Sequence, residues 1–200
     1  MSATNLDRRL DHADWRPAAA LAGVLLAGGI AGLLTAAASI GVSLAVCGAA
    51  FLAAGLGHFA LSFAGARERG ARWTGRALGT MMAVLGAALF FDPFAGLAPL
   101  RGSAGFVLTV VGVLRVAFAW RLLPDEGRVP MLGAGALSIL LGLVLMSVLP
   151  TGAPRALAAL LAVDLAVAGT ALLTVARQAR ATAGRARENR TSETGPRAPR

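Results

Sequence analysis

Between Arg16 and Arg67 lies a run of 50 residues that carries no acidic or basic side chain apart from His58. About 20 apolar residues of helix cross a bilayer core of about 30 Å, so the run is too long for one span. It fits two spans joined by a tight turn. We place these spans at residues 17–38 and 42–63, with the turn at 39–41.

The composition excludes a soluble enzyme. Hydrophobic residues make up 56% of the chain and charged residues 14%, whereas soluble domains average about 25% charged residues. Of the 29 charged residues, 15 lie before Pro17 or after Ala176, so the middle of the chain has too few charges to cover a water-exposed surface. The middle of the chain is therefore predicted to be a membrane domain.

Four further spans follow, and prolines mark the ends of two of them. They lie at residues 75–91, 102–120, 129–149 and 156–176, with Pro93 and Pro150 where a helix cannot continue. The predicted fold is an all-α integral membrane protein with six transmembrane helices. It has a polar leader (1–16), a transmembrane domain (17–176) and a basic tail (177–200), which we expect to be disordered because it is rich in Arg, Gly, Pro, Ser and Thr.

The arginines predict the orientation. If the N-terminus is cytoplasmic, 16 of the 19 arginines lie on the cytoplasmic side, Arg101 and Arg155 lie on the other, and Arg115 lies within a span. Short cytoplasmic loops are enriched in Lys and Arg, and Trp favours the membrane interface. All three Trp fall at the same ends of the spans as the arginines. We expect both termini to be cytoplasmic.

The net charge of +9 predicts a negatively charged partner, either nucleic acid or anionic lipid. The arginines cluster at the ends of apolar stretches, which favours the bilayer and its anionic lipid headgroups as partners over nucleic acid. Four arginines at the start of the tail lie close enough to the membrane to contact lipid: Arg177, Arg180, Arg185 and Arg187. The alternative is that they only fix the topology.

Glycines recur with a period near 57 residues. Gly55, Gly112 and Gly169 are 57 residues apart, and so are Gly29 and Gly86, with Gly142 one residue short of the same series. Such a period indicates three repeats, at about 17–66, 73–121 and 129–176. Each repeat holds two spans, so successive repeats enter the membrane from the same side and form three parallel helical hairpins.

The last two repeats carry a recognisable pattern. Their first spans read Met82-Ala-Val-Leu-Gly86-Ala-Ala-Leu-Phe-Phe-Asp-Pro93 and Leu137-Ser-Ile-Leu-Leu-Gly142-Leu-Val-Leu-Met-Ser-Val-Leu-Pro150, each followed by an apolar span, a glycine and an arginine-bearing end. This pattern resembles the HdeD family of bacterial multi-pass membrane proteins, over roughly residues 17–180. The first repeat lacks the proline. The resemblance implies six spans in the inner membrane and a contribution to acid resistance; it implies no catalytic residue.

Asp164, Arg115 and His58 form the candidate polar site, because ionisable side chains within the bilayer are costly unless they are paired or solvated. Asp164 lies near mid-membrane and is too short to reach the headgroups. It is therefore protonated, paired with His58 or Arg115, or exposed to water. We expect Asp164 to face the bundle interior, where its charge state would control helix packing or a polar path.

The two basic members of this site have simpler interpretations. Arg115 can extend its long side chain to the cytoplasmic headgroups, which we expect in preference to an ion pair. His58 lies 57 residues before Arg115, and Leu172 takes the same place in the third repeat, so no ring of three basic groups forms. His58 could exchange protons near neutral pH. As a neutral ring it would bond a neighbouring carbonyl.

No enzyme motif accompanies these residues. The chain has no HExxH, GxSxG, CxxC or phosphate-loop sequence, and its one cysteine, Cys47, has no partner for a disulfide or a metal site. We therefore expect a non-enzymatic protein without a cofactor or metal. Two other functions stay open: a small transporter or channel, including a proton-linked one, that uses Asp164, Arg115 and His58, and an accessory subunit of a membrane complex. A homo-oligomer or a membrane-protein partner also stays open.

Overall fold

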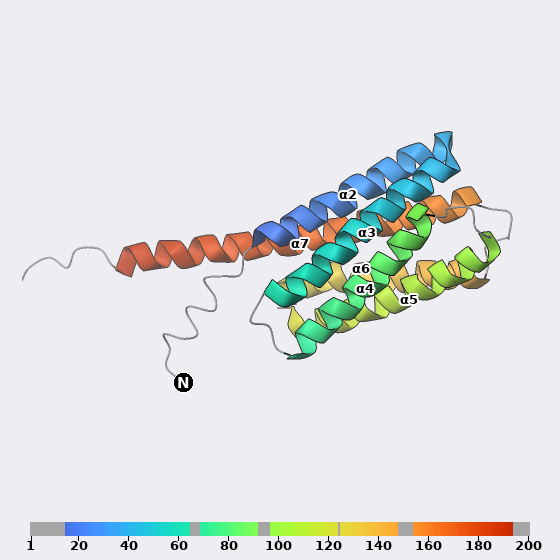
Figure 1. Cartoon of the computed structure of the whole chain (residues 1–200). Coiled ribbons are helices and arrows are strands. Elements are labelled where there is room, and N and C mark those ends of the chain that lie inside the picture. Colours follow the sequence, from blue (N-terminus) through green and yellow to red (C-terminus); the bar gives the residue numbers. More distant parts are fainter. Residues whose placement is uncertain (1–14, 65–68, 92–96, 124, 148–153, 194–200) are drawn as a thin grey trace, which may run out of the picture.

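The computed structural model describes residues 15–64, 69–91, 97–123, 125–147 and 154–193 (Figure 1). These residues form six α-helices: α2 (Trp15–Ala38), α3 (Ile40–Ala64), α4 (Arg69–Phe91), α5 (Leu97–Leu122), α6 (Asp125–Ser147) and α7 (Pro154–Glu193). Each is long and apolar enough to cross a membrane. No strand occurs in the described parts of the chain. The all-α fold class with six spans is confirmed.

All six observed helices begin earlier than the predicted spans, and α3, α5 and α7 also end later. Ser39 alone separates α2 from α3, where a turn of three residues was expected; its hydroxyl accepts a hydrogen bond from Val42 N at 3.5 Å, as at a helix N-cap. Helices α4 and α6 begin at Arg69 and Asp125, ahead of the apolar stretches. Apolar periodicity locates the part of a helix within lipid, whereas backbone hydrogen bonds continue into the polar flanks.

The sixth helix corrects the prediction for the tail. Helix α7 continues unbroken to Glu193, so the expectation of disorder from residue 177 is wrong as far as residue 193; residues 194–200 and the leader at 1–14 lie outside the described residues. The tail composition argued against a packed core, but alanines and arginines are good helix formers that can extend an existing helix turn by turn. In Figure 1 this extension runs straight out of the bundle, at the end where α2 begins.

The six helices form a closed ring. Each contacts the next along the chain, α7 contacts α2, and α7 also reaches across to α3. The most extensive contacts join α3 with α4, α5 with α6, and α2 with α7. The three closest pairs therefore combine helices from different predicted repeats.

Glycines and alanines let these three pairs approach closely. A Cβ added to Gly48 would lie 2.9 Å from Gly86 O, and one added to Gly105 would lie 2.8 Å from Gly142 O. In the third pair, a Cβ on Gly29 would lie 2.8 Å from Ala162 O. Gly48, Gly105 and Ala162 are themselves 57 residues apart. The same contact thus recurs with the predicted period, although a triplication of the sequence stays a prediction.

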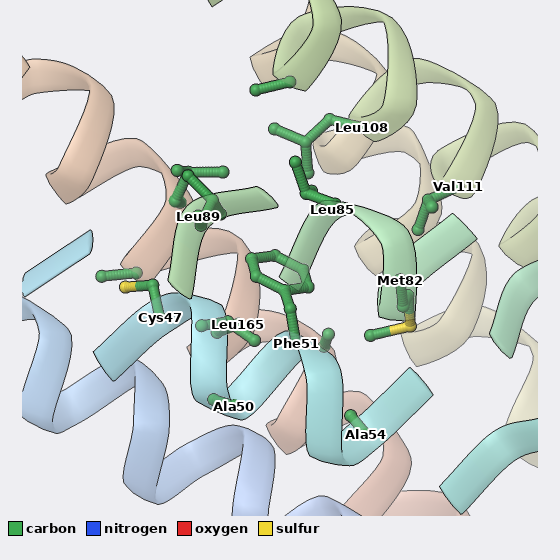
Figure 2. Close-up of a cluster of buried hydrophobic side chains, with 14 of the residues drawn as sticks. Cys47, Ala50, Phe51, Ala54, Met82, Leu85, Leu89, Leu108, Val111 and Leu165 are labelled. Carbon is green, nitrogen blue, oxygen red and sulfur yellow. The ribbon is translucent and has the colours of Figure 1, made fainter. Parts of the chain in front are cut away.

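The core lies between the pairs. Phe51 of α3 is fully buried among Met82, Leu85 and Leu89 of α4, with Leu165 of α7 close by (Figure 2). Many large apolar side chains point outward instead, including Leu34, Leu56, Phe91, Phe106 and Leu140. An exterior of this kind is stable in lipid and insoluble in water.

Candidate functional site: a buried ion pair between three helices

Three polar side chains meet inside the bundle, one from each of α5, α6 and α7. Arg115 Nη1 lies 3.2 Å from Asp164 Oδ1 and 3.3 Å from Asp164 Oδ2, so one guanidinium nitrogen faces both carboxylate oxygens. The same nitrogen donates to Ser138 Oγ at 2.6 Å. The resulting polar triad, Arg115, Ser138 and Asp164, connects α5, α6 and α7.

Ser138 can serve both charged partners because a hydroxyl is at once a donor and an acceptor. Its oxygen accepts from Arg115, and its proton can go either to Asp164 Oδ1 or to Ala134 O, which lies 2.9 Å away on the preceding turn of α6. Donation to the carboxylate strengthens the ion pair, since hydrogen bonds to charged groups are the stronger ones. Ser138 thereby links Arg115 and Asp164 through hydrogen bonds to both.

The triad is sealed from its surroundings. Relative exposure is 3% for Arg115, 1% for Asp164 and 0% for Ser138. Ion pairing stabilises the charged forms that burial alone would make prohibitive, and removing either partner would leave an uncompensated charge inside the protein. The arrangement can therefore fix the relative positions of three helices. It offers no exposed polar atom to a substrate from the bulk solvent.

The structure decides between the alternatives that the sequence left for Arg115 and Asp164. It pairs them, so the expectation that Arg115 extends to the headgroups is wrong. Arg115 points from α5 towards α6 and α7, and its long side chain crosses the gap between helices instead of running along its own helix. The expected interior position of Asp164 agrees with its burial on α7. A functional role for the pair stays a prediction.

His58 lies on α3 and is half-buried. Its backbone oxygen accepts a hydrogen bond from Ser62 Oγ at 2.8 Å. At the spacing that relates His58 to Arg115, the positions of Ser138 and Asp164 correspond to Met81 and Val107, which are apolar. The predicted group of three residues thus contains one ion pair, formed by Arg115 and Asp164, and a histidine on a different helix pair.

Ser138 was not singled out from the sequence. A serine in the middle of an apolar span is a weak signal, because serines are common in membrane helices and most bond their own backbone, as Ser147 does to Leu143 O. The one clue was its position in a span next to two spans with ionisable residues. Sequence alone does not show which helices are neighbours or which faces they share.

The other residues considered from the sequence carry little chemistry. Cys47 is fully buried on α3, and its sulfur would lie 2.6 Å from a Cβ added to Gly32 of α2, so it fills space between these two helices. Among the described residues, no three His, Cys, Asp or Glu side chains lie close enough together to hold a metal ion. Of the four predicted lipid-contact arginines, Arg177, Arg180 and Arg185 are exposed on α7. Arg187 belongs to the same helix.

Comparison with known proteins connects part of this bundle to a family. No curated protein and no solved structure matches the chain. Residues 77–147, which run from α4 through α5 to the end of α6 and include Arg115 and Ser138, match the family DUF308, a short repeat of unknown function.

Proposed function

We propose that this chain is an HdeD-like, non-enzymatic protein of the bacterial cytoplasmic membrane that supports tolerance of acid or envelope stress. The match of residues 77–147 to DUF308 carries the proposal, because DUF308 is the family of HdeD-like membrane proteins. The six apolar helices support its multi-pass membrane character.

The buried triad favours a structural role over transport. A transport site needs polar groups that water or substrate can reach in at least one state, whereas the described form keeps Arg115, Ser138 and Asp164 bonded to one another and buried. An ion pair of this kind resists separation of α5, α6 and α7. Such resistance is useful to a membrane protein that must keep its fold while the external pH falls.

Survival after acid challenge tests the proposal. The wild-type chain would be expressed in a bacterial strain that lacks its own HdeD-like protein, beside an empty vector and a variant in which Asp164→Leu leaves Arg115 unpaired. We expect the wild type to raise survival over the empty vector and the variant to lose that gain. Membrane levels of both proteins must be measured in the same cells. Equal survival of wild type and empty vector at normal membrane levels contradicts the proposal.

Proton flux separates this proposal from the transporter alternative. Purified wild type and Asp164→Asn would be reconstituted in liposomes under an imposed potential. We expect both to conduct no more than protein-free liposomes. Flux in the wild type that Asp164→Asn abolishes would instead identify a conducting path through the triad.

A further inference from the structure

Three arginine–aromatic pairs lie at one end of the bundle, one in each close helix pair. The guanidinium carbon of Arg76 lies 4.3 Å from the ring centre of Phe63, joining α4 to α3. Arg180 lies 5.0 Å from the Trp15 ring, joining α7 to α2, and Arg128 lies 5.5 Å from the Trp120 ring, joining α6 to α5. These distances are typical of cation–π contacts. All six residues lie where α3 and α5 end and α2, α4 and α6 begin, which we call the basic end.

Stacking on a ring uses the flat face of a guanidinium group and leaves its edge open. That edge carries five N–H donors in the plane of the group, in a geometry that matches the oxygens of a phosphate. Among the described residues, no carboxylate forms an ion pair with Arg76 or Arg180. Arg76 Nε is buried and has no hydrogen-bond acceptor in the described part of the chain, so it is not among the donors that a phosphate can reach.

A second arginine, which is exposed, lies near Arg76 and another lies near Arg180. Arg72 precedes Arg76 by one helical turn, and Arg177 precedes Arg180 by three residues, so each couple lies along one side of its helix. Two guanidinium groups on neighbouring turns can bind one phosphate from two directions. The basic end therefore offers paired donors beside an aromatic ring at two separate places.

The depth of these arginines in the membrane indicates which phosphate they bind. Arg72 begins the apolar span of α4, and Trp15 begins that of α2, so the arginines lie at the depth of the lipid headgroups. Trp73 and Trp120 at the same end are 68% and 66% exposed, as is typical of rings that lie in the interface. We propose that the basic end binds the phosphate groups of anionic phospholipids, at one site formed by Arg72 and Arg76 beside Phe63 and another formed by Arg177 and Arg180 beside Trp15.

Of the four arginines predicted to contact lipid from the tail, the proposal keeps Arg177 and Arg180 and leaves out Arg185 and Arg187. Helix α7 leaves the bundle without a bend (Figure 1), and an α-helix rises 1.5 Å per residue. Arg185 therefore lies about 7.5 Å, and Arg187 about 10 Å, further along the axis than Arg180. Charges on membrane lipids are screened over about 8 Å at physiological salt, so their attraction for Arg185 falls to less than half of that for Arg180. Arg185 is thus a matched control: it is an exposed arginine on the same helix, further from the headgroups.

The test counts lipids that stay bound to the full chain. Wild type, Arg76→Gln with Arg180→Gln, and Arg185→Gln would be released from vesicles containing equal amounts of phosphatidylcholine and phosphatidylglycerol, and retained lipids would be counted by native mass spectrometry. We expect the wild type to retain phosphatidylglycerol preferentially. Affinity should fall about fivefold for each arginine removed at the basic end, since each contributes about 1 kcal/mol near the surface. Arg185→Gln should lose less lipid affinity than either replacement at the basic end.

Each contrary result overturns the proposal. Equal retention of phosphatidylglycerol and phosphatidylcholine by the wild type shows no anionic preference. Undiminished retention in the double variant places the binding elsewhere, and an equal loss in Arg185→Gln assigns it to the part of α7 beyond Arg180. Displacement of the lipid by inorganic phosphate shows a site for a free anion. The double variant Arg76→Lys with Arg180→Lys keeps both charges and serves as a control for folding. In size-exclusion chromatography it should elute at the same volume as the wild type, and it should retain more lipid than the Gln variant.

Discussion

Among single residues, Asp164 and Arg115 stabilise the fold as a pair, whereas either one without the other destabilises it. Replacing Asp164 by leucine should lower the free energy of unfolding by about 3–5 kcal/mol, because Arg115 would stay buried without a counter-charge. The measurement is the thermal unfolding midpoint in detergent. The paired variant Arg115→Met with Asp164→Leu removes both charges and should recover most of this loss. A double variant as unstable as the single one would show that the pair does not compensate itself.

Ser138 should matter less than the charges and more than other serines. Ser138→Ala removes the acceptor for Arg115 and a donor to Asp164, which should cost about 1–3 kcal/mol of stability. Ser147→Ala is the matched control, since Ser147 is exposed and bonds the preceding turn of its own helix. Similar midpoints for the two variants would contradict a role for Ser138 in the triad.

Residue by residue, the triad could be located from the sequence only in part. Asp164 could be assigned to the interior because its short side chain has no route to the headgroups. The position of Arg115 could not be decided, since a long side chain reaches either the headgroups or a neighbouring helix. The role of Ser138 could not be predicted, because it depends on which face of α6 meets α5 and α7. That face is determined by contacts between segments far apart in the chain.

At the scale of elements, glycine contacts control how closely the helices pair. A Cβ on Gly86 would meet the backbone of Leu52 and lie 2.6 Å from Gly48 O, so Gly86→Ala must push α4 away from α3. We expect a loss of about 1–3 kcal/mol in the free energy of unfolding, as for overpacking of a core. Gly133→Ala is the control, because nothing lies within 4 Å of its added Cβ. It should be neutral or stabilise α6 by up to about 1 kcal/mol.

The elements themselves were the most predictable part. All six spans were predicted from apolar length, which depends on the thickness of the bilayer and not on tertiary contacts. The glycine period was also visible, and the same glycines make close contacts between helices. The partners were not predicted: Gly86 meets Gly48 of the preceding repeat, and Gly29 meets the far end of the chain at Ala162. The extension of α7 was missed because its composition is typical of disorder.

At the scale of the whole molecule, closing the ring places the start of α2 and the extension of α7 at one end of the bundle, where Arg180 stacks on Trp15. The distribution of arginines predicts that this end is cytoplasmic. Ser39, at the turn between α2 and α3, lies at the opposite end and is exposed. The two ends should therefore differ in their access to reagents that cannot cross the membrane.

Cysteine labelling tests this orientation. In a Cys47→Ala background, one variant would carry Ser39→Cys and another Gly184→Cys, both at exposed positions. A membrane-impermeant maleimide should label Ser39→Cys in intact spheroplasts and Gly184→Cys only after the membrane is opened. The reverse pattern would place the basic end outside, and labelling of both variants in intact spheroplasts would indicate a mixed orientation. Because 16 of 19 arginines share the predicted cytoplasmic side, the charge bias is large enough to predict a single orientation.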